Sequence, residues 1–152
     1  RRGPQKASGR DPEWRTPAFD VSNSDWKIHS RNPLAPPEYV GEDAIIKNSM
    51  IALGCEIEGT VINSLLSSNV IVKKGAFVKD SVIMSGTVIE EDARVTYAII
   101  DEDVTVSRGA VIGEERTSKK GIAVLGRNIV VEEGAILPGG NIVDKNVLKG
   151  GK

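Results

Sequence analysis

Branched aliphatic residues recur at intervals of five or six residues along this chain, from Ala44 to Leu148. In each unit a small residue stands two positions before the aliphatic residue, with a single spacer between them. The clearest pairs are Ala76/Val78, Ser81/Ile83, Thr87/Ile89, Ala93/Val95, Ala98/Ile100, Val104/Val106 and Ala110/Ile112. From Val72 onward one interval of five residues occurs for every two intervals of six residues between aliphatic positions. A repeat this short and regular predicts a solenoid, in which each unit packs against its neighbours.

Each unit is predicted to form a short β-strand. Residues two apart lie on the same face of a strand, and a unit of five or six residues is too short for a helix. Valine, isoleucine and threonine also favour strands. Glycine, asparagine or aspartate precedes many of the small residues, as at Gly75, Asp92 and Gly109. These residue types tolerate the tight or left-handed backbone that a sharp corner needs, so the strands are expected to meet at corners.

Three faces joined by such corners make a triangular prism, an all-β, single-stranded parallel β-helix. We count 18 faces from Ile46 to Leu148 if the irregular stretch after Ile112 spans two of them. This count predicts about six coils and a prism of about 25–30 Å in length. The repeat resembles the hexapeptide of left-handed parallel β-helices. The left hand is implied by that resemblance alone, because crossover connections are generally right-handed.

The composition changes near residue 40, since six of the seven prolines and four of the six aromatic residues precede it. Residues 1–10 are predicted to be a disordered tail or a cloning remnant, residues 11–40 an extended proline-rich connector, and residues 41–152 the β-helix domain. A prism exposes unpaired backbone at both ends, so both ends need a cap. We expect the connector to cover the first coil with Leu34 and Tyr39, and another subunit or a further segment to cover the far end.

Charge and composition narrow the classes of function. The net charge of −1 gives no general attraction to nucleic acid or to an anionic membrane. No apolar run has the length that a membrane-spanning helix needs and no signal-peptide pattern is present, so we expect a soluble cytoplasmic protein. The single cysteine, Cys55, excludes an internal disulfide framework and a multi-cysteine zinc site, and its small position in the repeat predicts a buried thiol. Phe77 and Tyr97 point outward and are separated by close to one coil, so they are predicted to share a face as an interface.

The chain offers little chemistry of its own, and we predict no catalytic and no metal-ligating residues. Hexapeptide acyltransferases use a histidine as general base, and trimeric carbonic anhydrases bind zinc with three histidines. The one histidine here, His29, precedes the first predicted coil, which disfavours both functions. Nucleotide-binding glycine motifs are also absent. Two alternatives stay open: an acyltransferase that binds acetyl-CoA between prisms, and a purely structural solenoid.

One place breaks the repeat. The interval from Ile112 to Leu125 is longer than two regular intervals, so a loop over residues 113–121 is predicted to bulge from the prism. Four cations lie in or just after this loop: Arg116, Lys119, Lys120 and Arg127. They predict an anion site, although Glu114 and Glu115 dilute the positive charge and a solvated loop is the alternative.

Three segments carry a resemblance to one family. They are Trp26–Tyr39, the stretch from Val40 to Ile57, and the block Val78–Met84 with the sequence Val-Lys-Asp-Ser-Val-Ile-Met. Over about residues 20–148 the chain resembles the C-terminal part of bacterial glucose-1-phosphate adenylyltransferase (ADP-glucose pyrophosphorylase). His29 stands where that family has an aromatic residue, which is a minor departure.

The resemblance implies a role in regulation and assembly. In that family an N-terminal domain makes ADP-glucose and pyrophosphate from ATP and glucose 1-phosphate with Mg²⁺, for glycogen synthesis. The β-helix contributes to allosteric control and to a tetramer. The resemblance thus implies that this chain lacks the catalytic domain, holds no cofactor and is inactive alone. A non-catalytic regulatory subunit of the same enzyme stays as an alternative.

The resemblance also points to an effector site. Residues 121–128, followed by Glu133–Ile136, are similar to a block in the plant enzymes in which a lysine followed by an asparagine contacts a phosphorylated activator. Arg127 stands at the place of the lysine and Asn128 at that of the asparagine. Arginine keeps the charge and adds bidentate geometry for a phosphate. The resemblance therefore implies a sugar-phosphate effector at Arg127 and Asn128, with Arg116, Lys119 and Lys120 as secondary contacts.

Overall fold

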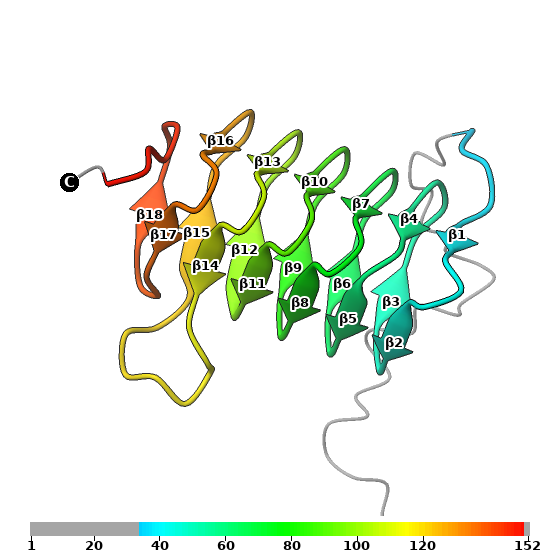
Figure 1. The fold of residues 1–152 in the computed structure, drawn as a ribbon, viewed down its shortest axis with the longest axis horizontal. Coiled ribbons are helices and arrows are strands. Elements are labelled where there is room, and N and C mark those ends of the chain that lie inside the picture. Colours follow the sequence, from blue (N-terminus) through cyan, green and yellow to red (C-terminus); the bar gives the residue numbers. More distant parts are fainter. Residues whose placement is uncertain (1–33, 151–152) are drawn as a thin grey trace, which may run out of the picture. The chain divides into compact units, whose positions relative to one another are not determined.

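The computed structural model describes residues 34–150, which form 18 short parallel β-strands and no helix (Figure 1). The predicted tail at 1–10, most of the connector and His29 lie outside the described residues. The strands wind into a β-solenoid of six coils, consistent with a left-handed β-helix, and every third strand belongs to the same sheet. The predicted fold class is confirmed.

Each of the three sheets contains six strands, one from each coil, and forms one wall of the prism. Sheet A contains β1 (Tyr39–Val40), β4 (Glu56–Ile57), β7 (Ile71–Val72), β10 (Val88–Ile89), β13 (Thr105–Val106) and β16 (Val130–Val131). Sheet B contains β2 (Ile45–Lys47), β5 (Thr60–Ile62), β8 (Phe77–Lys79), β11 (Arg94–Thr96), β14 (Val111–Gly113) and β17 (Ile136–Leu137). Sheet C contains β3 (Met50–Ile51), β6 (Leu65–Leu66), β9 (Val82–Ile83), β12 (Ala98–Ile100), β15 (Ala123–Leu125) and β18 (Ile142–Val143). Coils are numbered 1–6 below by the sheet C strand that each contains.

The register of the sheets follows the repeat. Phe77 on β8 pairs with Arg94 on β11, so one regular coil equals three intervals of the repeat. The second coil is two positions shorter than this at the corner between β4 and β5, as the pairing of Glu56 with Ile71 shows. The coil that contains the predicted loop is longer, as the pairing of Ala98 with Ala123 shows. The sheets therefore stay in register through coils of unequal length.

The interior of the prism is a single apolar column. Both members of every pair that the pattern singled out are buried, and the core continues from Cys55 to Leu137. The few buried polar side chains satisfy backbone groups. Ser81 accepts a hydrogen bond from the Ala98 amide (3.1 Å) and donates one to the Lys79 carbonyl (2.7 Å). A small polar residue at this position thus bridges consecutive coils, and no described buried side-chain polar atom lacks a partner.

Corner residues adopt the left-handed backbone. The glycines and aspartates predicted to make corners have positive φ, for example Gly75 (78°) and Asp92 (58°), which confirms their role. The pattern did not single out the corner between sheets B and C, which is made by Asn48, Asn63, Asp80 and Tyr97. Tyr97 is unusual there, because a positive φ of 49° is unfavourable for a bulky side chain.

The side chains of Leu34 and Tyr39 do not cap the first coil. We expected Leu34 and Tyr39 to plug this end, but the side chains are 107% and 57% exposed, so that expectation is wrong. Instead Tyr39–Val40 forms β1, the sheet A strand of this coil, and the Gly54 amide donates a hydrogen bond to the Pro36 carbonyl (2.8 Å). Among residues 34–150, β1 is the end strand of sheet A and pairs only with β4.

Candidate effector site and groove

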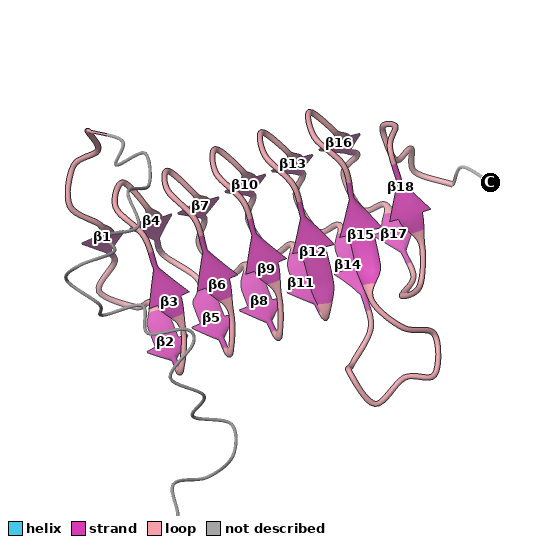
Figure 2. Cartoon of the chain, turned by 180° about the vertical axis from the view of Figure 1, so that it is seen from behind, coloured by secondary structure: helices cyan, strands magenta, loops and turns pink. Residues whose placement is uncertain are grey.

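A loop over residues 114–122 leaves the solenoid between β14 and β15, at the corner between sheets B and C (Figure 2). The sequence predicted a loop here but counted two faces between Ile112 and Leu125. The structure corrects this count, because the two strands are consecutive and the extra length of the coil belongs to the loop. The total of 18 strands is reached because β1 adds a face before Ile46.

Much of the charge of the loop is neutralised by neighbouring side chains. Glu114 accepts hydrogen bonds from Lys120 Nζ (2.6 Å) and Ser118 Oγ (2.9 Å), and these two donors lower the pKa of its carboxyl group. Glu115 pairs with Lys79 on β8 (2.6 Å), and this hydrogen bond raises the pKa of the lysine. Among residues 34–150, neither Arg116 nor Lys119 takes part in an ion pair.

The hydrogen bonds of Glu114 predict how the loop responds to pH. A carboxyl group with a depressed pKa in the folded state stabilises that state above its unfolded value, and this contribution is lost as the pH falls through the folded-state pKa. We expect the NMR shifts of Ser118 and Lys120 to follow the protonation of Glu114 with a midpoint below the ordinary value of 4.5. The Glu114→Gln variant is the control and should lack this transition. A transition centred at or above 4.5 would contradict the two hydrogen bonds.

Arg127 and Asn128 lie at the corner that follows β15. The Arg127 guanidinium forms an ion pair with Glu102, which stands at the equivalent corner of the preceding coil. Asn128 has a positive φ of 58°, and its amide donates a hydrogen bond to the Glu102 carbonyl (3.0 Å). Asn128 therefore has a structural role at this corner, and an anion at Arg127 has to compete with Glu102.

The five predicted effector residues fall into two groups. Arg116, Lys119 and Lys120 lie on the loop before β15, whereas Arg127 and Asn128 lie at the corner after it. The whole strand Ala123–Leu125 separates the groups. The arrangement thus contains two cationic positions, one at each end of strand β15. A small anion can contact one group at a time.

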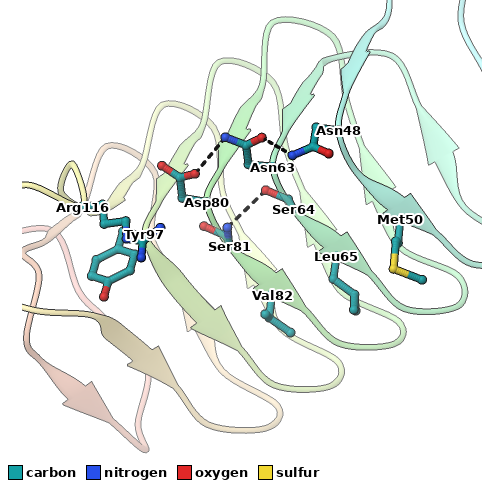
Figure 3. A pocket seen from close by; sticks show the side chains of 10 residues that line it. All are labelled: Asn48, Met50, Asn63, Ser64, Leu65, Asp80, Ser81, Val82, Tyr97 and Arg116. Carbon is teal, nitrogen blue, oxygen red and sulfur yellow. Dashed lines mark hydrogen bonds between the residues drawn. The ribbon is translucent and has the colours of Figure 1, made fainter. Parts of the chain in front are cut away.

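A groove of about 610 Å³ runs along the corner between sheets B and C (Figure 3). One wall is a polar ladder, in which Asn48 donates to Asn63 (2.8 Å) and Asn63 donates to Asp80 (3.2 Å). The other wall is apolar and consists of outward side chains of consecutive sheet C strands, Met50, Leu65 and Val82. Tyr97 and Arg116 stand at the end nearest the loop.

Sequence reasoning missed this groove, although a signal was present. Asn48, Asn63 and Asp80 follow one another at steps of one coil each, so the three side chains had to stack. The first step is two positions shorter than the second, because it includes the short corner between β4 and β5 in coil 2. Because of that difference, the ladder became visible only once the register of coil 2 was known.

The structure also corrects the pairing of the two outward aromatic residues. Arg94, not Tyr97, lies beside Phe77, with its guanidinium carbon 4.6 Å from the ring centroid. The reason is that one regular coil carries the chain from Phe77 to Arg94, so Tyr97 falls beyond the strand position opposite Phe77. Both aromatic side chains are half-buried, and only Tyr97 borders the groove.

Cys55 is buried as predicted. Its thiol donates to the Ser67 carbonyl (3.0 Å), and burial raises its pKa. Over residues 34–150 no three histidine, cysteine, aspartate or glutamate side chains come together as a candidate metal site. Within the same residues no helix has the length and apolarity needed to cross a membrane.

The fold and the repeat place this chain among the hexapeptide-repeat β-solenoids. More narrowly, it belongs to the family of GlmU-like C-terminal hexapeptide domains, whose model matches residues 37–131. Solved structures agree on the fold. The acetyltransferase domain of PglB from Neisseria gonorrhoeae superposes with a TM-score of 0.59 at 22% identity, over 72% of this chain and 55% of that one. A GDP-perosamine N-acetyltransferase from Caulobacter crescentus superposes with a TM-score of 0.59 at 14% identity, over 71% of this chain and 53% of that one.

The sequence relatives confirm the resemblance. A glucose-1-phosphate adenylyltransferase from Acetivibrio thermocellus is 32% identical in an alignment that covers 91% of this chain and 38% of the relative. The same enzyme from Corynebacterium jeikeium is 42% identical over 126 residues, covering 76% of this chain and 31% of the relative. That from Clostridium perfringens is 42% identical over 124 residues, covering 78% and 31%. The chain thus spans about a third of the length of these relatives.

Proposed function

We propose that this chain is the regulatory and assembly domain of a glucose-1-phosphate adenylyltransferase, which converts ATP and glucose 1-phosphate into ADP-glucose and pyrophosphate. The observation that carries the proposal is the identity of 32–42% with enzymes of that name. Catalysis, with its ATP and Mg²⁺, is the work of a separate nucleotidyltransferase domain, the first partner of this one. The enzyme is a cytoplasmic oligomer, a tetramer by analogy with its family. The likeness to acetyltransferases is one of fold alone, because the identity is at most 22%.

A chimera tests this proposal. Residues 1–152 would replace the matching part of the Corynebacterium jeikeium enzyme, and ADP-glucose formation would be measured with and without fructose 1,6-bisphosphate. We expect the chimera to make ADP-glucose and the separate chain to make none. A soluble, folded chimera without activity would contradict the assignment. The acetyl-CoA alternative is tested with the separate chain, and acetyl-CoA binding would favour it.

The effector contact is proposed at Arg127, where a phosphate would replace Glu102 as partner of the guanidinium. An exposed ion pair contributes only about 0–1 kcal/mol, so a dianionic phosphate can displace it. We therefore expect the Glu102→Gln variant to bind fructose 1,6-bisphosphate up to about fivefold more tightly, because the competing carboxylate is gone. The Arg127→Gln variant should lose binding.

NMR titration of the separate chain measures both effects. Shifts should centre on residues near 127 and 128, and sulfate should give the same shifts more weakly. The Lys119→Gln variant is the control, because it removes one positive charge from the loop. If it loses as much affinity as the Arg127→Gln variant, the effector binds at the loop and not at Arg127. Equal affinity of the Glu102→Gln variant and the unaltered chain would contradict competition at the ion pair.

A further inference from the structure

One outward ladder of sheet C is apolar from the first coil to the last. Consecutive strands of this sheet place one outward residue of each coil in register. The six residues, here called the sheet C stripe, are Met50, Leu65, Val82, Ile99, Val124 and Ile142. The equivalent ladder of sheet A contains Glu56 and Thr105, and that of sheet B contains Thr60 and Arg94. Only the sheet C ladder, among the three, has no polar residue.

The ends of the stripe are its most exposed parts. Met50 is 71% exposed and Ile142 is 82% exposed, so apolar side chains face solvent at both ends of the same wall. With a strand spacing of about 4.8 Å, the stripe is about 25 Å long. A continuous apolar strip of this kind on a soluble domain indicates an interaction surface.

We propose that two copies of this chain associate through the sheet C stripe, with their solenoid axes antiparallel and the two-fold axis along the strand direction. Coil 1 of one copy then faces coil 6 of the other, coil 2 faces coil 5, and coil 3 faces coil 4. In this order Met50 meets Ile142 of the second copy, Leu65 meets Val124, and Val82 meets Ile99. Each contact joins residues from opposite halves of the stripe, so a single patch is self-complementary, as a two-fold interface requires.

The size of the stripe shows that a second contact is needed. A strip of about 25 Å by about 10 Å offers roughly 250 Å² per copy, whereas a stable interface buries about 800 Å² per partner. The groove beside the stripe, with a volume of about 610 Å³, and the projecting loop over residues 114–122 can supply the remainder. The proposal therefore places the loop of each copy in the groove of the other.

The antiparallel order brings these two features together. The loop leaves the solenoid at coil 5, and the groove is centred on coil 2, where Asn63 and Leu65 lie. Coil 5 faces coil 2 only when the axes are antiparallel, and a two-fold axis along the strands keeps the loop and the groove on the same edge. Parallel axes would instead put the loop beside the opposite corner of its neighbour.

Charge favours the same arrangement. Arg116 and Lys119 of the loop take part in no ion pair among residues 34–150, and Asp80 lies in the polar wall of the groove. In the antiparallel pair the loop cations of one copy approach Asp80 of the other. The proposal deepens the assembly part of the proposed function, but its test needs neither catalysis nor an effector.

Sedimentation velocity of the 152-residue chain at micromolar concentrations tests the association. We expect a dimer for the unaltered chain, and an increase in the dissociation constant of at least about 100-fold for Val82→Asp, which puts a charge at the centre of the stripe. Val88→Asp is the matched control, because this half-buried valine lies on the strand that follows β9 but faces outward from sheet A. It should leave the dimer intact, and circular dichroism checks that both variants fold.

Cysteine cross-linking tests the antiparallel order. Met50→Cys and Ile142→Cys chains, mixed under oxidising conditions, should form a disulfide between unlike chains, and neither should cross-link with itself. Cys55 does not interfere, because it is buried. The Asp80→Asn variant should weaken the dimer measurably and reduce its sensitivity to salt.

Three results would overturn the proposal. A monomeric unaltered chain would assign the sheet C stripe to a different partner. A dimer that survives Val82→Asp would place the interface elsewhere, and self-cross-linking of Met50→Cys would show parallel axes. Each of these results leaves the proposed function open to its own test, because the chimera is judged by ADP-glucose formation.

Discussion

Replacing Ile89 by alanine is expected to lower the free energy of unfolding by about 3–4 kcal/mol. The Ile89 side chain is fully buried in coil 4, near the middle of the apolar column. The substitution removes buried methyl groups and leaves a cavity that short, mutually paired strands cannot close. In a solenoid each coil couples only to its neighbours, so a defect in the middle also weakens the coupling between the two halves. We therefore expect a less cooperative denaturant transition, followed by circular dichroism.

The matched control is Ile71→Ala. Ile71 lies on the neighbouring strand of sheet A but faces outward, where it is half-buried. Removing its side chain should cost about 1 kcal/mol or less, because no closed cavity forms. Equal losses at the two positions would contradict the inward and outward assignment of sheet A.

Replacing Gly113 by alanine is expected to cost about 3 kcal/mol or more, through two additive effects. Gly113 has a positive φ of 73°, which disfavours any residue with a Cβ atom. A Cβ atom built there would also overlap the carbonyl oxygen of Thr96 in the preceding coil. Backbone atoms of a paired strand cannot move aside, so the ladder between β11 and β14 has to open.

Gly109→Ala separates the two effects. Gly109 also has a positive φ, of 64°, but a Cβ atom there would meet nothing within 4 Å. Its substitution should cost only the conformational part, about 1 kcal/mol. Thermal unfolding of the two variants gives the comparison. If Gly113→Ala were no worse than Gly109→Ala, the close approach to Thr96 would be wrong.

The core and the corners could be predicted because they depend on local chemistry. A small residue and an aliphatic residue two apart must face the same side of a strand, and Asp92 or Gly75 tolerates a left-handed corner wherever it stands. The candidate site was harder. Arg127 and Asn128 are adjacent in sequence, but the carboxylate that engages Arg127 comes from Glu102, one long coil earlier in the chain. Short, regular and long coils occur together, and their unequal lengths hide such neighbours from a fixed period.

The sequence alone determined that this protein is a β-solenoid of about six coils with a dry aliphatic interior, because burial of each unit requires only the alternation within that unit. It also determined the place of the loop, since the interval between aliphatic positions after Ile112 is longer than the repeat allows. Only the tertiary structure decided which outward residues become neighbours. The groove, the ion pair at Arg127 and the sheet C stripe each join residues from different coils, and their alignment is fixed by strand pairing rather than by local preference.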